Sequence, residues 1–177
     1  MTLLAVAVGG LSMGGCLALR LAQQRPDDVA ALVLVNPAVA SSNRQLLAVP
    51  LLSRLVASRP GLGDDIKKPG VCEDAYDRVP LRALASMLQM WRVVRADLGA
   101  VTAPVLLLRS AVDHVVDPSS ARIILGGVSS PVVREVVLHD SYHVATLDND
   151  AALICSESAA FLAEHVGSPA REVPHEL

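Results

Sequence analysis

Aromatic residues are almost missing from this chain, which has one Trp, two Tyr and one Phe among its 177 residues. Apolar residues nevertheless make up 52% of the chain, so Ala, Val and Leu must supply the core. Small and branched side chains of this kind suit helices packed tightly on a parallel sheet. Because only 19% of the residues are charged, we expect a folded chain, and its length suits a single domain.

Lysine is also scarce, although arginine is plentiful, and the basic residues are scattered along the chain. Lysine occurs only at positions 67 and 68, and the net charge at pH 7 is −3. A nucleic-acid partner would require a run of basic side chains to neutralise its phosphates. The composition therefore predicts no nucleic-acid partner.

Cysteines and long apolar stretches are too few for several other classes of protein. The three cysteines, at positions 16, 72 and 155, form no CxxC pair, so we expect no disulfide framework, no metal or other cofactor, and a cytoplasmic location. The apolar run at residues 3–8 has no positive charge ahead of it and stops at two glycines. This run predicts a buried strand, and neither a signal peptide nor a membrane insertion.

Apolar runs and helical patterns alternate along the chain. The runs predict buried strands at residues 3–8, 29–35, 105–108 and 132–138. Helical spacing, with suitable residues at the helix ends, predicts helices at residues 14–24, 81–98, 117–125 and 151–165. The alternation predicts the α/β class, with a mostly parallel sheet flanked by helices.

One region lacks this alternation. Proline and glycine residues divide residues 38–80 into short pieces, with a possible helix at residues 45–58. We interpret this region as a small cap-like insertion over the sheet. The predicted organisation is one partial domain at residues 1–166 and a disordered tail at residues 167–177.

The strongest chemical signal is the pattern G-x-S-x-G at residues 10–14, between a predicted strand and a predicted helix. In this setting the pattern predicts a nucleophile elbow, a tight turn that presents Ser12 above the sheet. Gly10 and Gly14 would allow neighbouring backbone to come close. The turn would also direct the backbone N–H of Met13 toward a developing oxyanion, as part of an oxyanion hole. A phosphate-binding turn is the alternative, but the spacing G-x-G-x-x-G is missing and Asn36, not an acidic residue, ends the next strand.

A serine nucleophile needs a base, and the base needs an acid that orients it. In folds with a nucleophile elbow these residues follow in the order Ser, acid, His, at the ends of later strands. Asp113 follows the strand predicted at residues 105–108, and His143 follows the strand predicted at residues 132–138. We therefore predict a catalytic triad of Ser12, Asp113 and His143.

Four nearby residues allow other assignments. Asp117 precedes a proline at a helix start, where capping explains it. His139 lies at a strand end, closer to the sheet than a base that reaches Ser12 should be. We expect His114 to be a loop histidine with a local hydrogen bond, and Cys16 to be a small core residue.

Three segments read GLSMGG at residues 10–15, DHVV at residues 113–116 and SYHVATLD at residues 141–148. Together they resemble the bacterial carboxylesterase and monoacylglycerol lipase group of the α/β hydrolases, and the third segment is much more specific to this group than the first. The resemblance extends to about residue 165. It implies the C-terminal portion of an α/β-hydrolase fold, hydrolysis of small-molecule carboxylic esters with short or medium acyl chains, and a cap built from residues 38–80.

The chain departs from this group at its beginning. Members have several strands and an oxyanion loop before the nucleophile, so the resemblance implies an N-terminal truncation, with Met1 as an internal or misassigned start and without the second oxyanion donor. It also implies an uncovered sheet edge, through which self-association is expected. The alternatives to an ester hydrolase are a truncated inactive paralogue that acts as a binding module, and an acyltransferase or C–C hydrolase with the same triad.

Overall fold

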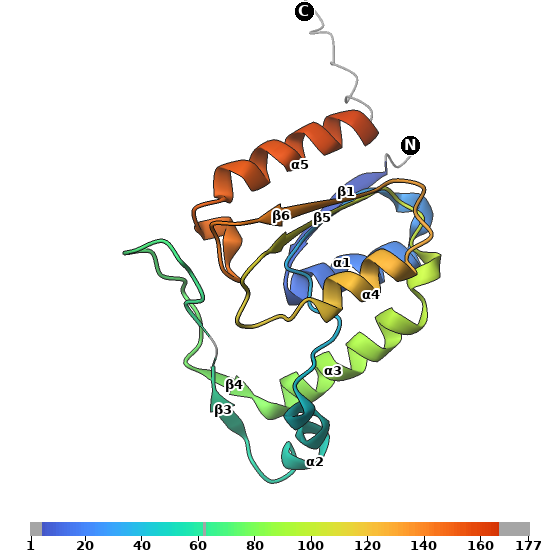
Figure 1. Cartoon of the computed structure of the whole chain (residues 1–177). Helices are drawn as coiled ribbons and strands as arrows, with labels where there is room; N and C mark the ends of the chain where they lie inside the picture. Colours follow the sequence, from blue (N-terminus) through green and yellow to red (C-terminus); the bar gives the residue numbers. More distant parts are fainter. Residues whose placement is uncertain (1–4, 62, 167–177) are drawn as a thin grey trace, which may run out of the picture.

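The main sheet has four parallel strands in this computed structural model, which describes residues 5–61 and 63–166. The strands are β1 (Val6–Leu11), β2 (Val29–Val35), β5 (Val105–Ser110) and β6 (Val133–Leu138), and their order across the sheet is β1-β2-β5-β6 (Figure 1). The predicted α/β class with a mostly parallel sheet is confirmed. The tail predicted at residues 167–177 lies outside the described residues, as do residues 3 and 4 of the first predicted strand.

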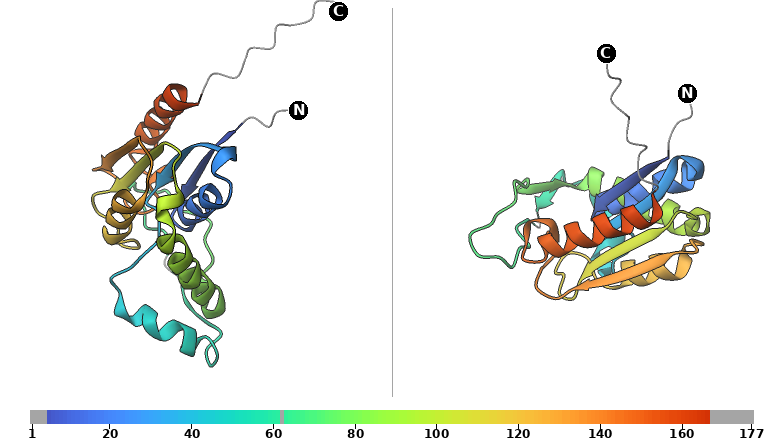
Figure 2. Two further views of the ribbon diagram at one scale, coloured as in Figure 1. Left: turned by 90° about the vertical axis from the view of Figure 1, so that its right-hand side faces the viewer. Right: turned by 90° about the horizontal axis from the view of Figure 1, so that it is seen from above.

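Helices cover both faces of the sheet. Three of them, α1 (Met13–Gln24), α3 (Leu81–Ala96) and α4 (Ser119–Gly127), lie on one face, and α5 (Ala151–His165) lies on the other (Figures 1 and 2). Alternate strand residues face two separate cores: Leu32 and Leu34 belong to the first, whereas Val33 and Val35 face α5. In the described part of the chain, no helix is both long and apolar enough to cross a membrane.

The predicted strands and helices are present, with shifted ends. The largest shift among the strands is in β1, which continues to Leu11 although the sequence predicts an end at Val8. Gly9 and Gly10 stay paired with residues of β2. The backbone ladder therefore continues through the glycines, and the strand ends only at the turn that carries Ser12.

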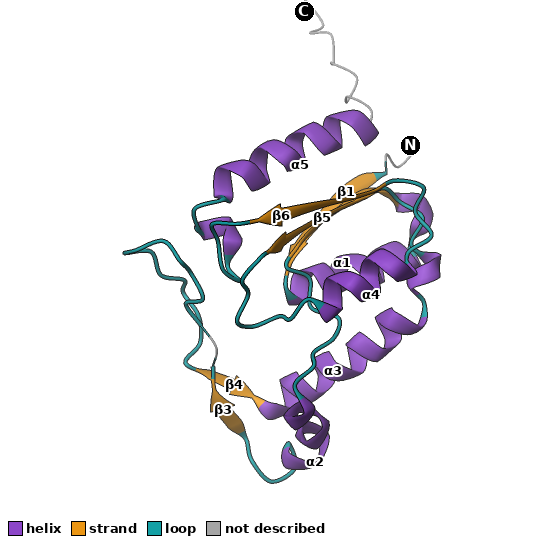
Figure 3. Cartoon of the chain, in the orientation of Figure 1, coloured by secondary structure: helices purple, strands orange, loops and turns teal. Residues whose placement is uncertain are grey.

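The cap, residues 38–80, lies beyond the carboxyl ends of the strands (Figure 1). It contains the 3-10 turn η2 (Arg44–Ala48), the short helix α2 (Val49–Leu52) and an antiparallel pair of strands, β3 (Ser58–Pro60) and β4 (Arg78–Pro80). Much of the remainder is loop (Figure 3). Helix α3 follows β4 directly and runs from the cap down to the first core.

The helix predicted at residues 45–58 is wrong beyond Leu52. Leu47, Leu51 and Leu55 are 74%, 66% and 81% exposed, so no core lies on that side to stabilise a longer helix. Short helices in proteins gain most of their stability from a packed apolar face. The chain extends instead into β3, which pairs with β4.

Among the described strands, β1 lies at one edge of the sheet, with β2 as its one neighbour. Val6 of this strand is 55% exposed. Met13, Leu17 and Leu21 are also exposed, at successive turns of the helix that follows. Within residues 5–61 and 63–166, the strand that leads to Ser12 therefore has unpaired backbone groups along one side.

Candidate active site

Ser12 occupies a sharp turn between β1 and α1. Its backbone angles are φ 53° and ψ −116°, and a positive φ is costly for a residue with a Cβ atom. The turn is held by the neighbouring strand, because Ser12 N–H donates to the Val35 carbonyl at 3.0 Å and the Ser12 carbonyl accepts from Ala38 N–H at 3.0 Å. This strained geometry is the one that a nucleophile elbow requires.

Glycines make the turn possible, but at positions that differ partly from the prediction. A Cβ atom on Gly10 would lie 2.3 Å from the backbone of Gly14, and a Cβ atom on Gly15 would lie 2.8 Å from Cβ of Pro37. A Cβ atom on Gly14 would meet nothing within 4 Å outside its own helix backbone. The expectation that Gly14 is needed for close approach is therefore wrong, and Gly15 is the second glycine that the turn requires.

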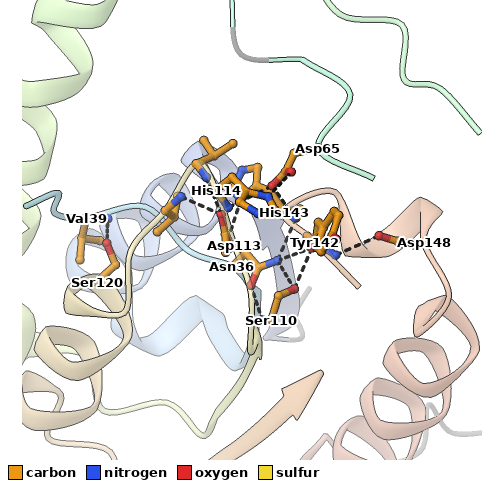
Figure 4. A network of polar contacts seen from close by, with 12 residues as sticks. Asn36, Val39, Asp65, Ser110, Asp113, His114, Ser120, Tyr142, His143 and Asp148 are labelled. Atoms are coloured by element: carbon orange, nitrogen blue, oxygen red, sulfur yellow. Dashed lines mark hydrogen bonds and ion pairs between the residues drawn. The ribbon is translucent and has the colours of Figure 1, made fainter. Parts of the chain in front are cut away.

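Asp113 and His143 form a buried pair. His143 Nδ1 lies 2.8 Å from Asp113 Oδ2, and the two side chains are 8% and 7% exposed (Figure 4). The other carboxylate oxygen, Oδ1, accepts the backbone N–H groups of Val115 and Val116 at 2.8 and 2.7 Å. The acid is thus fixed by its own loop, and the His143 ring keeps Nε2 for another partner.

Asn36 holds the loop of His143 over the middle of the sheet. Its side-chain Nδ2 donates to the His143 carbonyl at 2.8 Å, and its Oδ1 accepts from Ser110 N–H at 2.7 Å (Figure 4). Asn36 is buried and directly follows β2, which lies between β1 and β5. This bond therefore brings His143 from the end of β6 back toward the strand beside Ser12.

The sequence analysis missed this role of Asn36 and used the residue only to argue against a dinucleotide site. Asn36 has a positive φ of 43°, a conformation in which asparagine is enriched. The sequence did offer a signal for this role: Asn36 is a polar residue between a buried strand and a proline, at the sheet edge where the other site residues lie.

Ser12, Asp113 and His143 all lie at the carboxyl edge of the parallel sheet. The backbone of Ser12 is bonded to Val35, just before Asn36, and to Ala38, two residues after it, and Asn36 is bonded to His143. Within residues 5–61 and 63–166, no hydrogen bond joins the Ser12 hydroxyl to His143. Such contacts in free enzymes are often long and shorten when the substrate binds.

The rival acid, Asp117, has a different function in the structure. It accepts the backbone N–H of Ser119 at the start of α4 at 2.9 Å and that of Ser42 in the cap at 2.6 Å. Burial opposes the ionisation of Asp117, but hydrogen bonds from Ser119 and Ser42 outweigh it and lower its pKa to about 2. Asp117 therefore fixes the start of α4 and binds the first residues of the cap insertion.

In the described residues, none of the other candidates bonds to the side chain of Asp113 or His143. His139 is exposed after the end of β6. The sequence predicted a local hydrogen bond for His114, and this prediction is wrong. Its Nδ1 lies 2.7 Å from Oδ1 of Asp65 in the cap. Cys16 is fully buried, and burial raises the pKa of its thiol to about 11 against the opposing charge of Arg95. A protonated thiol in the core is no competing nucleophile.

A cavity of about 240 Å³ lies between Ser12 and the cap. Most of its lining is apolar, with Leu46, Leu84, Met87 and Trp91 among the side chains, and Arg59 is the one charged residue among the described residues that line it. The backbone N–H of Met13, the first residue of α1, has no acceptor within the helix. The site thus offers an apolar pocket and a backbone donor next to one serine hydroxyl.

In the described residues, no group of three or more His, Cys, Asp or Glu side chains has an arrangement that could hold a metal ion. The three cysteines are free thiols, and Cys72 and Cys155 are exposed.

Known proteins similar to this chain are hydrolases. A family model described as serine aminopeptidase, S33, matches residues 2–69. The thermostable monoacylglycerol lipase of Bacillus sp. (strain H-257) is 38% identical over 167 residues, which cover 92% of this chain and 64% of that protein. Among solved structures, one reported for the metagenome-derived lipolytic enzymes LipS and LipT has 38% identity and a TM-score of 0.85, covering 89% of this chain and 64% of that one.

The fold extends to more distant proteins. A monoacylglycerol lipase from Paleococcus ferrophilus has 19% identity and a TM-score of 0.75, covering 90% of this chain and 69% of that one. The chain spans 64% of the length of the Bacillus lipase and of the LipS/LipT structure, so a third of each has no counterpart in the aligned region.

Proposed function

We propose that this chain, as a member of the α/β-hydrolase superfamily, is a serine hydrolase of carboxylic esters, with Ser12, His143 and Asp113 as its catalytic triad. The observation that carries this proposal is the strained turn at Ser12, at the same sheet edge as the buried pair of Asp113 and His143. A positive φ at a non-glycine residue is costly unless the surrounding structure holds it, and here Val35 of β2 and Ala38, just after β2, hold it through backbone hydrogen bonds.

The proposed mechanism uses three groups: the Ser12 hydroxyl, Nε2 of His143 and the backbone N–H of Met13. His143 Nε2 takes the proton of the Ser12 hydroxyl as Ser12 Oγ attacks the ester carbonyl, and Asp113 stabilises the protonated ring. The backbone N–H of Met13 donates to the oxyanion of the tetrahedral intermediate. The C–O bond to the alcohol then breaks, and the alcohol leaves with the proton from His143. Water releases the acid from the acyl-enzyme, with His143 as the base.

The cavity supports a small ester as substrate. A volume of about 240 Å³ with mostly apolar lining suits a short or medium acyl chain, since such pockets hold ligands by burying their apolar surface. The Bacillus relative is a monoacylglycerol lipase, which makes monoacylglycerols natural compounds to test. The cytoplasmic location and the lack of a nucleic-acid partner remain predictions from the composition.

The test is covalent labelling of the 177-residue chain with a fluorophosphonate, together with hydrolysis of p-nitrophenyl butyrate. We expect labelling and hydrolysis in the native chain, and neither in Ser12→Ala. Ser156→Ala is the matched control, because this serine is exposed on α5 and bonds only within its helix; both activities should persist in it.

Other results would favour the alternatives. A folded chain that is not labelled would contradict catalysis by this chain and favour a binding module. Labelling of Ser12 without release of acid, but with transfer of the acyl group to an added alcohol, would favour an acyltransferase. Cleavage of a C–C substrate by the labelled serine would favour a C–C hydrolase.

A further inference from the structure

Asp65, a residue of the cap, contacts both loops that carry the acid–base pair. Its Oδ2 accepts the backbone N–H groups of His143 and His114, each at 3.1 Å (Figure 4). Its Oδ1 lies 2.7 Å from Nδ1 of His114, and its backbone carbonyl accepts from Val144 N–H at 3.1 Å. One cap residue thus bonds to the loop after β5 and to the loop after β6.

These contacts complete the fixation of His143. The carbonyl of His143 is bonded from the sheet side by Asn36, and its N–H is bonded from the cap side by Asp65. The neighbour of Asp113, His114, is held by the same carboxylate. Asn36 and Ser110 bond the His143 loop from the sheet side, and Asp65 bridges the same loop to the Asp113 loop from the cap side.

The Asp65 carboxylate is well suited to this task. Its side chain is 14% exposed, and all of its bonds to these loops come from N–H or ring nitrogen atoms. Burial opposes ionisation, but the hydrogen bonds from His114 and His143 outweigh it and lower the pKa of Asp65. An ionised carboxylate that accepts several N–H groups makes stronger hydrogen bonds than a neutral acceptor.

Other contacts between the cap and the His143 loop do not reach the pair. Asp148 accepts the backbone N–H groups of Lys67 and Lys68 at 2.7 and 2.9 Å. Lys67 Nζ also pairs with Asp140 at 2.6 Å on the surface. These bonds attach the cap segment to the loop, but they involve neither the backbone of His143 nor the loop of Asp113.

We propose that Asp65 is a positioning residue, through which the cap holds the His143 and Asp113 loops in the geometry needed for proton transfer. This inference rests on the proposed function. It makes the cap part of the acid–base apparatus as well as a wall of the substrate cavity. An error of about 1 Å in the position of a catalytic group can reduce a rate on the order of a hundredfold, so the loss of this bridge should reduce kcat.

The test compares Asp65→Ala with Asp65→Asn in the full chain. Asparagine keeps an oxygen that accepts both N–H groups, and its amide can donate to His114 Nδ1 in the matching tautomer. We expect Asp65→Ala to lower kcat for p-nitrophenyl butyrate by about 10- to 100-fold, with KM nearly unchanged, and Asp65→Asn to restore most of the loss. Lys67→Ala is the matched control: it removes a side-chain contact between the same two segments and should leave kcat unchanged.

A second measurement does not require turnover. The hydrogen-bonded Nδ1–H proton of His143 should give a far-downfield NMR resonance, assigned by its loss in His143→Gln. We expect this resonance to persist in Asp65→Asn and Lys67→Ala and to broaden or vanish in Asp65→Ala. If the native chain hydrolyses no ester, this result still tests the positioning role separately from the proposed function.

Two results would overturn the positioning role. One is an Asp65→Ala protein with the native kcat and the native His143 resonance. The other is an Asp65→Asn protein that loses as much kcat as Asp65→Ala, since this would assign the effect to the charge of Asp65 and not to the geometry that it holds.

Discussion

The two halves of the candidate site are built in different ways. The nucleophile half, β1 with the turn at Ser12, depends on local backbone: two tight glycines and bonds to the next strand. The acid–base half depends on side chains far apart in the sequence, with Asn36 and Asp65 bonded to His143 from 107 and 78 residues away. The first half lies at an open sheet edge, and the second is buried.

This difference explains how each half responds to change. A local turn is fixed by a few covalently linked residues, so it tolerates an open surface beside it. The contact of Asp113 with His143 depends on several segments that are far apart in the sequence and must all be correctly placed. Buried polar groups are costly when one partner is missing. We therefore expect chemistry to be most sensitive in the buried half, and folding and association to be most sensitive in the open half.

The largest effect is expected from Asp113→Asn. An amide cannot hold the His143 ring in the tautomer that accepts the serine proton, and in a triad of this type such a change lowers kcat on the order of ten-thousandfold. The measurement is kcat for p-nitrophenyl butyrate, with circular dichroism to establish that the variant is folded.

The matched control is Asp117→Asn, four residues further along. Asparagine serves at a helix start about as well as aspartate, so this variant should lose little stability and leave kcat nearly unchanged. A large loss of kcat in Asp117→Asn together with a small loss in Asp113→Asn would reverse the assignment of the acid.

The sequence could predict the nucleophile half because its geometry is written in adjacent residues. G-x-S-x-G between a strand and a helix predicted the sharp turn at Ser12, and apolar runs predicted the strands. It predicted the types and order of Asp113 and His143, because each follows a buried strand. It could not predict that Asn36 and Asp65 meet His143, since such contacts depend on the tertiary path of the loops and leave no periodic pattern in the chain.

The second prediction concerns the two glycines of the elbow. Gly10→Ala would place a Cβ atom 2.3 Å from the Gly14 backbone, an overlap that neither strand nor helix can relieve without moving. We expect a loss of about 1–3 kcal/mol in the free energy of unfolding and slower fluorophosphonate labelling. Urea unfolding and labelling rates measure both.

Gly14→Ala is its matched partner, because a Cβ atom there meets open space. Alanine favours a helix over glycine by about 0.5–1 kcal/mol, so this variant should be at least as stable as the native chain and label normally. Equal destabilisation by the two substitutions would contradict the distinction between them.

The cap shows where reading from the sequence stops. The three-residue strands β3 and β4 are too short to give an alternating pattern, and the exposed leucines before them suggested a helix that has no core to pack on. Their pairing joins residues about 20 apart in the sequence. The loop between them has no apolar periodicity from which the pairing could be predicted. Tertiary contact, not local preference, decides the structure there.

The smallest effect is expected at the sheet edges, in self-association. The two edge strands differ: β6 carries Arg134 and Glu135, whereas the described part of β1 has no charged residue. Charges on an edge strand oppose pairing with another chain, so we expect association through β1. Val6→Lys should weaken dimerisation about tenfold, equivalent to roughly 1.4 kcal/mol, while Val133→Lys at the start of β6 should change it little. Analytical ultracentrifugation over a range of concentrations measures both, and a native chain that is monomeric at every concentration would show that the open edge does not pair.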